Sequence, residues 1–152
     1  QYGAAKVYAI DVGYGQLAYR LRNDARVVNM ERTNVRDLVS LPEPVKLVVI
    51  DVSFISLRLV LPVVRSWLEP GYPIIALFKP QFEAGKAIVD ACKGVIKDKS
   101  IHAKLLDAFV VWLHENDFTV YDRCDSPIHG DKGNAEFLLL IHSSSSIVKQ
   151  AD

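Results

Sequence analysis

KLVVIDVSFISLRLVLPVVRSWL, residues 46–68, contains a strand pattern that runs directly into a helix pattern. Residues 46–52 are nearly all apolar before Asp51, which is typical of a parallel strand covered on both faces. From Ser56 onward apolar residues recur at helical spacing, and the Ser56 hydroxyl can cap the helix start. Pro70 and Gly71 then end the helix. A strand followed by a helix is the repeating unit of α/β proteins.

The same alternation extends along the whole chain. Short β-branched or aromatic runs predict further strands at residues 6–11, 26–31, 73–78, 118–123 and 135–142. Amphipathic spacing predicts further helices at residues 16–22 and 100–116, and residues 81–99 are expected to form a loop with one or two helical turns. The fold class predicted is therefore α/β, with a mostly parallel sheet and helices on both faces.

Length and composition narrow the class of protein. The 152 residues suffice for one domain with a core, and 50% hydrophobic with 24% charged residues is ordinary globular composition. The 18 basic and 18 acidic residues balance to zero, which argues against a stand-alone nucleic-acid binder. No apolar run approaches the roughly 18 residues of a membrane span, so no membrane partner is expected. Cys92 and Cys124 fit free thiols in a reducing cytoplasm.

Charged residues stand at the ends of four predicted strands. Asp11, Glu31 and Asp51 close or nearly close three of them, and Lys79 closes a fourth. In a parallel sheet all four would project from one edge, where α/β proteins bind ligands. A carboxylate there can accept two hydrogen bonds from a ribose diol. The alternative is that each acid caps the helix that follows it.

Asp51 and Lys79 are the most specific pair. A lysine beside a carboxylate in a cleft can hold or release a proton near neutral pH. Glu136 begins an apolar strand, so it would be partly buried and would need a partner, for which Lys79 is the obvious candidate. Such a group can activate a hydroxyl for attack. The alternative is a structural salt bridge.

Other motifs in the chain point to no separate chemistry. No Gly-x-Ser-x-Gly sequence surrounds Ser53, and residues 13–15 are too short for a phosphate loop. No metal site is expected, because the four histidines show no metal-ligand spacing: His102, His114, His129 and His142.

Five segments together resemble the TlyA/hemolysin-A family of FtsJ-like, S-adenosylmethionine-dependent methyltransferases. They are DVGYGQLAYRLR (11–22), ERTN (31–34), DVSFISLRLVLP (51–62), KPQFEAG (79–85) and SPIHGDKGNAEFLL (126–139). The resemblance implies a Rossmann-type methyltransferase sheet whose last strand is antiparallel. It also implies 2′-O-methylation of ribose in ribosomal RNA, in the cytoplasm, with ribosomal RNA or a ribosomal subunit as partner and no DNA.

The resemblance also implies roles for individual residues. Asp51, Lys79 and Glu136 match the catalytic set, and Asp51 is also assigned to the cofactor site. Asp11 matches the acid that binds the ribose of S-adenosylmethionine, and Asn34 takes the place of the residue that reads the adenine. The strand-end argument favoured Glu31, which the family motif replaces with Asn34. Lys79, steered by the two carboxylates, would deprotonate or orient the ribose 2′-hydroxyl for in-line attack on the methyl group.

Part of the family pattern is expected to lie upstream of Gln1. This part comprises the first strand with its glycine-rich cofactor loop, one catalytic lysine and a small RNA-binding domain. Residues 1–142 are thus expected to form the methyltransferase domain without that loop, and residues 143–152 a flexible tail. The isolated chain is expected to be inactive. The alternatives are a non-catalytic relic that binds RNA or another partner, and a hemolysin-like membrane-active protein.

Overall fold

The structure, a computed structural model, describes residues 3–130 and 133–143. These residues fold into two compact units. Unit 1 lies within residues 1–41 and unit 2 within residues 42–152. The predicted flexible tail falls, apart from Ser143, outside the described residues.

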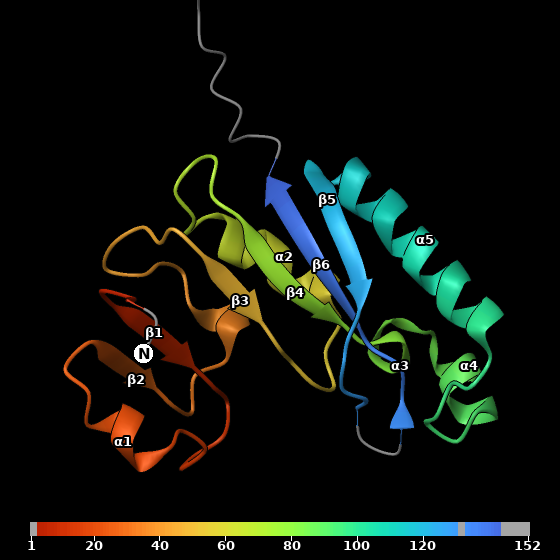
Figure 1. The fold of residues 1–152 in the computed structure, drawn as a ribbon, viewed down its shortest axis with the longest axis horizontal. Helices are drawn as coiled ribbons and strands as arrows, with labels where there is room; N and C mark the ends of the chain where they lie inside the picture. Colours follow the sequence, from red (N-terminus) through yellow and green to blue (C-terminus); the bar gives the residue numbers. More distant parts are fainter. Residues whose placement is uncertain (1–2, 131–132, 144–152) are drawn as a thin grey trace, which may run out of the picture. The chain divides into compact units, whose positions relative to one another are not determined.

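Unit 1 is built on two parallel strands, β1 (Val7–Ile10) and β2 (Val27–Met30). One-turn helix α1 (Tyr19–Arg22) connects them, and the 3-10 helix η1 (Val35–Asp37) follows β2 (Figure 1). Because both strands run the same way, Asp11 and Glu31 follow them at one edge of this small sheet.

Unit 2 contains a four-stranded sheet in the order β3-β4-β6-β5. Its strands are β3 (Val48–Ile50), β4 (Ile74–Phe78), β5 (Phe118–Asp125) and β6 (Phe137–Ser143). β3 and β4 are parallel, whereas β6 runs antiparallel to both β4 and β5. Phe78 pairs with Phe137, so the end of β4 lies beside the start of β6.

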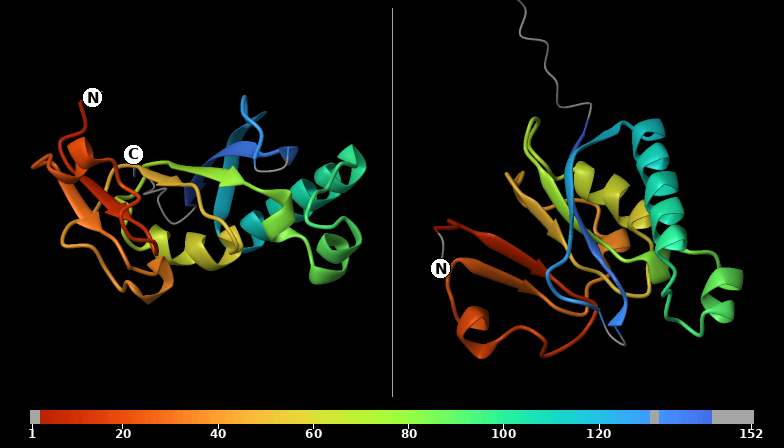
Figure 2. Two further views of the ribbon diagram at one scale, coloured as in Figure 1. Left: turned by 90° about the horizontal axis from the view of Figure 1, so that it is seen from below. Right: turned by 45° about the vertical axis from the view of Figure 1, so that its right-hand side comes forward.

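The long helices of unit 2 are α2 (Leu57–Arg65) and α5 (Lys99–Glu115), and the short ones are α3 (Pro80–Glu83) and α4 (Lys86–Ala91). α2 and α5 lie on the same face of the sheet (Figure 2), and Arg58 of α2 lies over two aromatic rings of α5. They bury alternate residues of the central strands, with Phe78 5.0 Å from Phe109 between ring centroids. This single layer of side chains is the core.

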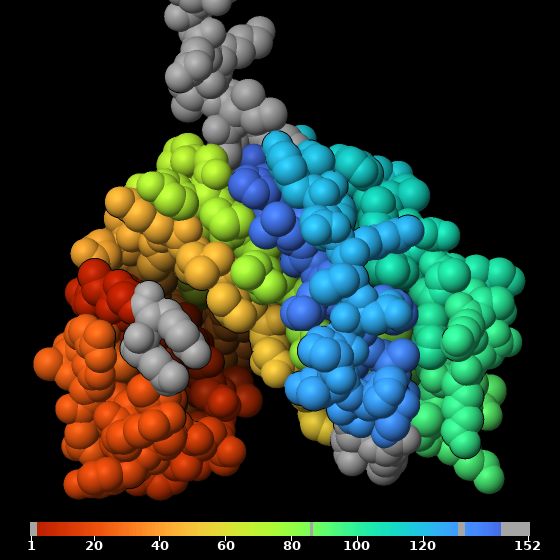
Figure 3. Space-filling model, in the orientation of Figure 1, coloured from red at the N-terminus to blue at the C-terminus, as the bar shows by residue number. Residues whose placement is uncertain are grey.

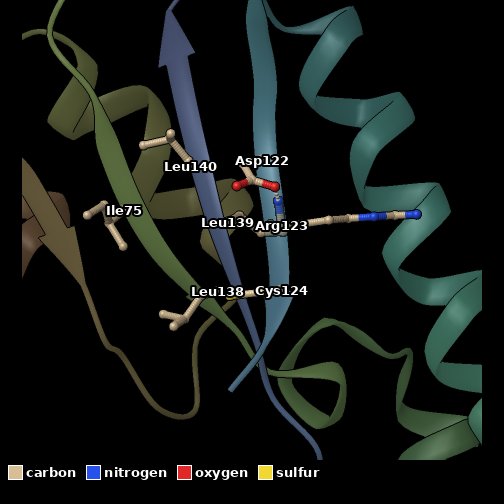
Figure 4. Close-up of a pocket in the computed structure, with 7 residues that line it drawn as sticks. All are labelled: Ile75, Asp122, Arg123, Cys124, Leu138, Leu139 and Leu140. Carbon is tan, nitrogen blue, oxygen red and sulfur yellow. Dashed lines mark hydrogen bonds between the residues drawn. The ribbon is translucent and has the colours of Figure 1, made fainter. Parts of the chain in front are cut away.

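The opposite face of the sheet is open in the part of the chain that the structure describes. Side chains of β4, β5 and β6 form the surface toward the viewer in Figure 3. Val49 is 67% exposed and Tyr121, at a β-bulge, is 63% exposed. A shallow hollow on this face is lined by Ile75, Asp122, Arg123, Cys124, Leu138, Leu139 and Leu140 (Figure 4). None of the predicted site residues lines it.

The structure confirms the predicted strands and helices, and the segment expected to hold one or two helical turns contains α4 and most of α3. One feature differs from the prediction. The four strand-end residues were expected at one edge of one sheet, but they stand on two sheets, because β1 pairs with β2 and β3 with β4 among the described strands. The α/β fold class agrees with the prediction.

Candidate active site

An ion pair joins the ends of the two parallel strands of unit 2. Lys79 Nζ lies 2.6 Å from Asp51 Oδ1 and 3.2 Å from Ser53 Oγ, to which it donates a hydrogen bond. The Lys79 side chain is only 11% exposed, whereas that of Asp51 is 67% exposed. The lysine is therefore held firmly while its carboxylate partner faces solvent. Sequence predicted this pair, and the structure brings it together.

The loop between β3 and α2 carries Ser53, the second partner of Lys79. Phe54 has φ of +63°, a left-handed conformation that is unusual for a bulky residue. Ser56 then caps α2 by accepting a hydrogen bond from the Arg58 backbone N–H. Ser53, directly before Phe54, accepts the hydrogen bond from Lys79 Nζ.

Glu136 lies at the same end of the sheet. It precedes Phe137, whose partner Phe78 precedes Lys79, so the antiparallel register brings the two backbones side by side. Its side chain is buried as predicted, and a Cβ on Gly130 would collide with its carboxylate. The predicted Lys79–Glu136 contact differs in detail, because the ion pair that Lys79 makes is with Asp51. Asp51 directly follows the adjacent strand β3, and its carboxylate lies 2.6 Å from the Lys79 ammonium.

A second carboxylate, Glu83, is buried close to this pair. Its side chain is 2% exposed at the end of α3, and it accepts hydrogen bonds from Ser56 Oγ at 2.6 Å and from the Leu57 backbone N–H at 2.7 Å. Burial raises the pKa of Glu83, and the hydrogen bonds from Ser56 and Leu57 partly offset that rise.

A pair of aromatic rings, Phe54 and Phe82, lies near Lys79, with Phe82 nearest the ammonium. Phe54 is 91% exposed, and its ring centroid lies 5.1 Å from that of Phe82. Lys79 Nζ lies 6.0 Å from the Phe82 ring centroid. A large apolar side chain that is both exposed and held in a left-handed conformation is costly for the fold alone, which favours a ligand-binding role.

In unit 1, Asp11 closes a tight turn after β1. Its Oδ1 accepts a hydrogen bond from the Gly13 backbone N–H at 2.7 Å. A Cβ at Gly13 would lie 2.9 Å from Gln16 Cγ, so the exposed Gln16 side chain would have to move to admit a larger residue. Among the hydrogen bonds of the described residues, Asp11 Oδ2 makes none, so one carboxylate oxygen can face a hydroxyl.

Asn34 and Glu31 follow β2. The Asn34 side-chain oxygen caps η1 by accepting from the Arg36 backbone N–H at 3.1 Å. Glu31 is nearly buried, and its Oε1 lies 3.7 Å from Arg22 Nη2. Glu31 Oε1 is buried and has no hydrogen-bond partner among the described residues, so the distant Arg22 guanidinium balances its charge only in part.

A family model for FtsJ-like methyltransferases matches residues 1–142. This chain belongs to the FtsJ-like methyltransferase family. The α/β fold with a mixed sheet agrees with this membership, and a methyl donor of the S-adenosylmethionine type is implied by it.

Two relatives of this FtsJ-like chain are named as rRNA methyltransferases. It is 47% identical over 148 residues to the "Putative rRNA methyltransferase YqxC" of Bacillus subtilis, covering 93% of this chain and 51% of the relative. It is 44% identical over 147 residues to the 16S/23S rRNA (cytidine-2′-O)-methyltransferase TlyA of Mycobacterium tuberculosis, covering 94% and 54%. The FtsJ-like chain thus spans about half the length of these relatives.

A solved structure is also similar. The "putative hemolysin from Streptococcus thermophilus" superposes with a TM-score of 0.85 at 41% identity, over 95% of this chain and 53% of that one. None of the helices in the described part of the FtsJ-like chain is both long and apolar enough to span a membrane.

Sequence reasoning did not identify four residues that the structure places around the Lys79–Asp51 pair: Ser53, Phe54, Phe82 and Glu83. All four lie inside the DVSFISL and KPQFEAG segments, which were quoted for the resemblance without roles for these positions. The spacing from Lys79 to Glu83, one helical turn, was the available signal.

Proposed function

We propose that the protein containing this chain transfers a methyl group from S-adenosylmethionine to a ribose 2′-hydroxyl of ribosomal RNA. The observation that carries the proposal is the Lys79–Asp51 ion pair at the carboxyl ends of β3 and β4, with Ser53 in contact and Glu136 beside it. Names of relatives at 44–47% identity support ribosomal RNA as the substrate.

The chemistry assigned to this chain is the handling of one proton and one hydroxyl. Lys79 donates to Asp51 and Ser53 as an ammonium group, and these contacts fix the direction of its remaining N–H. This N–H can hold and orient a 2′-hydroxyl, and the hydroxyl proton can pass to the Asp51 carboxylate or to solvent as the oxygen becomes the nucleophile. Glu136, buried at the same end of the sheet, is the further carboxylate of the proposed catalytic set.

Residues of unit 1 fit the proposed cofactor. S-adenosylmethionine, when bound, supplies a methyl group on a sulfonium sulfur, which leaves as a neutral thioether. Asp11 would accept hydrogen bonds from the cofactor ribose with the oxygen that Gly13 does not use, and Asn34 would contact the adenine. Asp51, also assigned to the cofactor, has the exposed carboxylate that such a role needs.

The aromatic pair Phe54 and Phe82 supports a nucleic-acid substrate over a small polar one. Bases of single-stranded RNA stack on exposed aromatic faces, and this interaction tolerates any base. A ring beside Lys79 would hold the base of a nucleotide whose ribose lies at the lysine.

The test is a methyl-transfer assay with the full-length gene product, ribosomal RNA and tritiated S-adenosylmethionine, with 2′-O-methyl nucleosides identified by mass spectrometry. Lys79→Met and Asp51→Asn should each reduce the rate by about 10²–10⁴-fold, as expected for loss of positioned acid–base groups. Lys104→Met, which removes an exposed lysine of α5, is the matched control and should retain wild-type activity.

Two results would reject the proposal. Methyl transfer that survives Lys79→Met would exclude the assigned chemistry. A wild-type protein that binds ribosomal RNA but transfers no methyl group would leave the binding-module alternative in its place. Leakage of liposomes by the wild-type protein at physiological salt would instead favour the membrane-active alternative.

A further inference from the structure

Glu83 is a buried carboxylate that the proposed chemistry does not use. With 2% of its side chain exposed, it cannot touch an RNA or cofactor atom. Its oxygens accept from Ser56 Oγ and the Leu57 backbone N–H, and the Arg58 guanidinium lies 3.7 Å away. All three partners belong to the N-terminal turn of α2.

The two ends of this contact come from the two loops that hold the ion pair. Glu83 ends α3, whose N-cap is Lys79. Ser56 is the N-cap of α2 and follows Asp51 and Ser53 in the preceding loop. The carboxylate therefore ties the Asp51 loop to the Lys79 loop, one helical turn away from the pair itself.

Fold stability alone does not explain a charged side chain at this position. A buried carboxylate loses hydration that hydrogen bonds and a nearby cation only partly replace, and an apolar residue of similar volume is often no less stable. The raised pKa of Glu83 has the same physical cause. What an apolar residue could not supply is a pair of directed hydrogen bonds between the loops.

We propose that Glu83 is a positioning residue that sets the separation and orientation of Asp51 and Lys79 by anchoring the start of α2 to the end of α3. This inference rests on the proposed function. Glu83 acts through its hydrogen bonds to Ser56 and Leu57. A shift of these two residues would move the loop that carries Asp51 relative to Lys79.

The first test measures single-turnover methyl transfer and S-adenosylmethionine affinity in the full-length gene product. Glu83→Ala should lower the transfer rate by about 10²-fold, the cost of a small misplacement of reacting groups. Affinity for S-adenosylmethionine, measured by calorimetry, should fall much less than the transfer rate, because the other two residues assigned to the cofactor, Asp11 and Asn34, lie outside the two loops that Glu83 joins. Asp107→Ala, an exposed acid of α5, is the matched control.

Rescue by a conservative variant separates positioning from a general loss of stability. The amide of Glu83→Gln can accept from the Leu57 N–H and donate to Ser56 Oγ, so most of the lost rate should return. Ser56→Ala removes only one of the two hydrogen bonds and should give an intermediate rate, which keeps the test available even where Glu83→Ala fails to fold. Wild-type rates in Glu83→Ala or Ser56→Ala, or a Glu83→Gln rate as low as that of a folded Glu83→Ala, would overturn the inference.

A crystal structure of the Ser56→Ala variant tests the placement without any activity. The Lys79–Asp51 ion pair should open or become disordered, and an unchanged pair would overturn the inference. An inactive wild-type protein whose pair opens in this variant would instead reject the proposed function and leave the positioning role standing.

Discussion

The Glu83 carboxylate shows how one buried residue makes stability depend on pH. Burial, the largest cause, raises its pKa, so the folded protein holds this proton at a pH where the unfolded chain has released it. The charged group that faces it is Arg58, from α2. Stability should therefore fall as pH rises from the ordinary glutamate pKa, about 4.3, through the raised value in the folded state.

Glu83→Gln should remove this dependence. Below the ordinary pKa the wild-type protein and the variant both carry a neutral side chain, so their melting temperatures should be similar. Above the raised pKa the variant should gain relative to the wild type, because it has no charge to bury. Thermal melts across a pH series measure the difference, and a gap that does not change with pH would contradict the account.

Phe54 is a residue whose backbone conformation and exposure favour a ligand-binding role. With a φ of +63° and 91% of its surface exposed, Phe54 contributes little to the stability of the fold. Its ring lies against Phe82, which is beside Lys79. Phe54→Ala should raise the dissociation constant for ribosomal RNA by about tenfold, since stacking of one base contributes about 1–3 kcal/mol. Filter binding of the full-length gene product measures it.

A nearby exposed apolar residue gives the control for that test. Leu59→Ala changes a half-exposed side chain of α2 and should leave RNA affinity unchanged. Equal RNA affinity in wild type and Phe54→Ala would remove the stacking role.

Among the elements, α5 depends on its cap. Asp98 Oδ1 accepts from the Ser100 backbone N–H at 2.7 Å and is the N-cap of the helix. Hydrogen bonds from Ser100, the largest cause, lower the pKa of Asp98. The ionised cap therefore stabilises the helix above the ordinary aspartate pKa, about 3.9, and this contribution is lost as pH falls through the lowered value.

Asp98→Ala should consequently lower the melting temperature at neutral pH, and the loss should shrink in acid. Asp107→Ala, on the same helix, is the comparison, because its exposed pair with Arg123 at 3.6 Å contributes little. Calorimetric melts at neutral and acidic pH measure both variants. A larger effect of Asp107→Ala would contradict the assignment of the cap.

At the scale of the whole molecule, the sheet of unit 2 buries one face and leaves the other open in the described residues. Val49 and Tyr121 are prominent on that open face, and the hollow of Figure 4 lies between β4, β5 and β6. An apolar sheet surface of this kind binds hydrophobic dyes and promotes association.

The isolated 152-residue chain should therefore bind the dye ANS in its folded state. Val49→Thr combined with Tyr121→Thr should reduce the fluorescence, because threonine suits a strand but is less apolar. The melting temperature reports whether the double variant still folds. Dye binding that is the same in both proteins would place the apolar surface elsewhere.

The sequence by itself determined the strands and helices and identified the charged residues at the strand ends. The periods of apolar residues gave the strands and helices, and Asp51, Lys79 and Glu136 follow or precede strands in a way that short-range pattern reveals. These features are local, because the apolar pattern of a strand or helix and the polar residue beside it both lie within about ten residues of sequence.

Only the tertiary structure decided which groups touch. Glu83 lies 27 residues from Ser56, and no local period links them. Likewise, Lys79 pairs with Asp51 because strand order places β3 next to β4. The two long helices of unit 2 share one face of the sheet because they pack against each other. Contacts between distant segments depend on how the layers stack, which the spacing of residues along one segment does not encode.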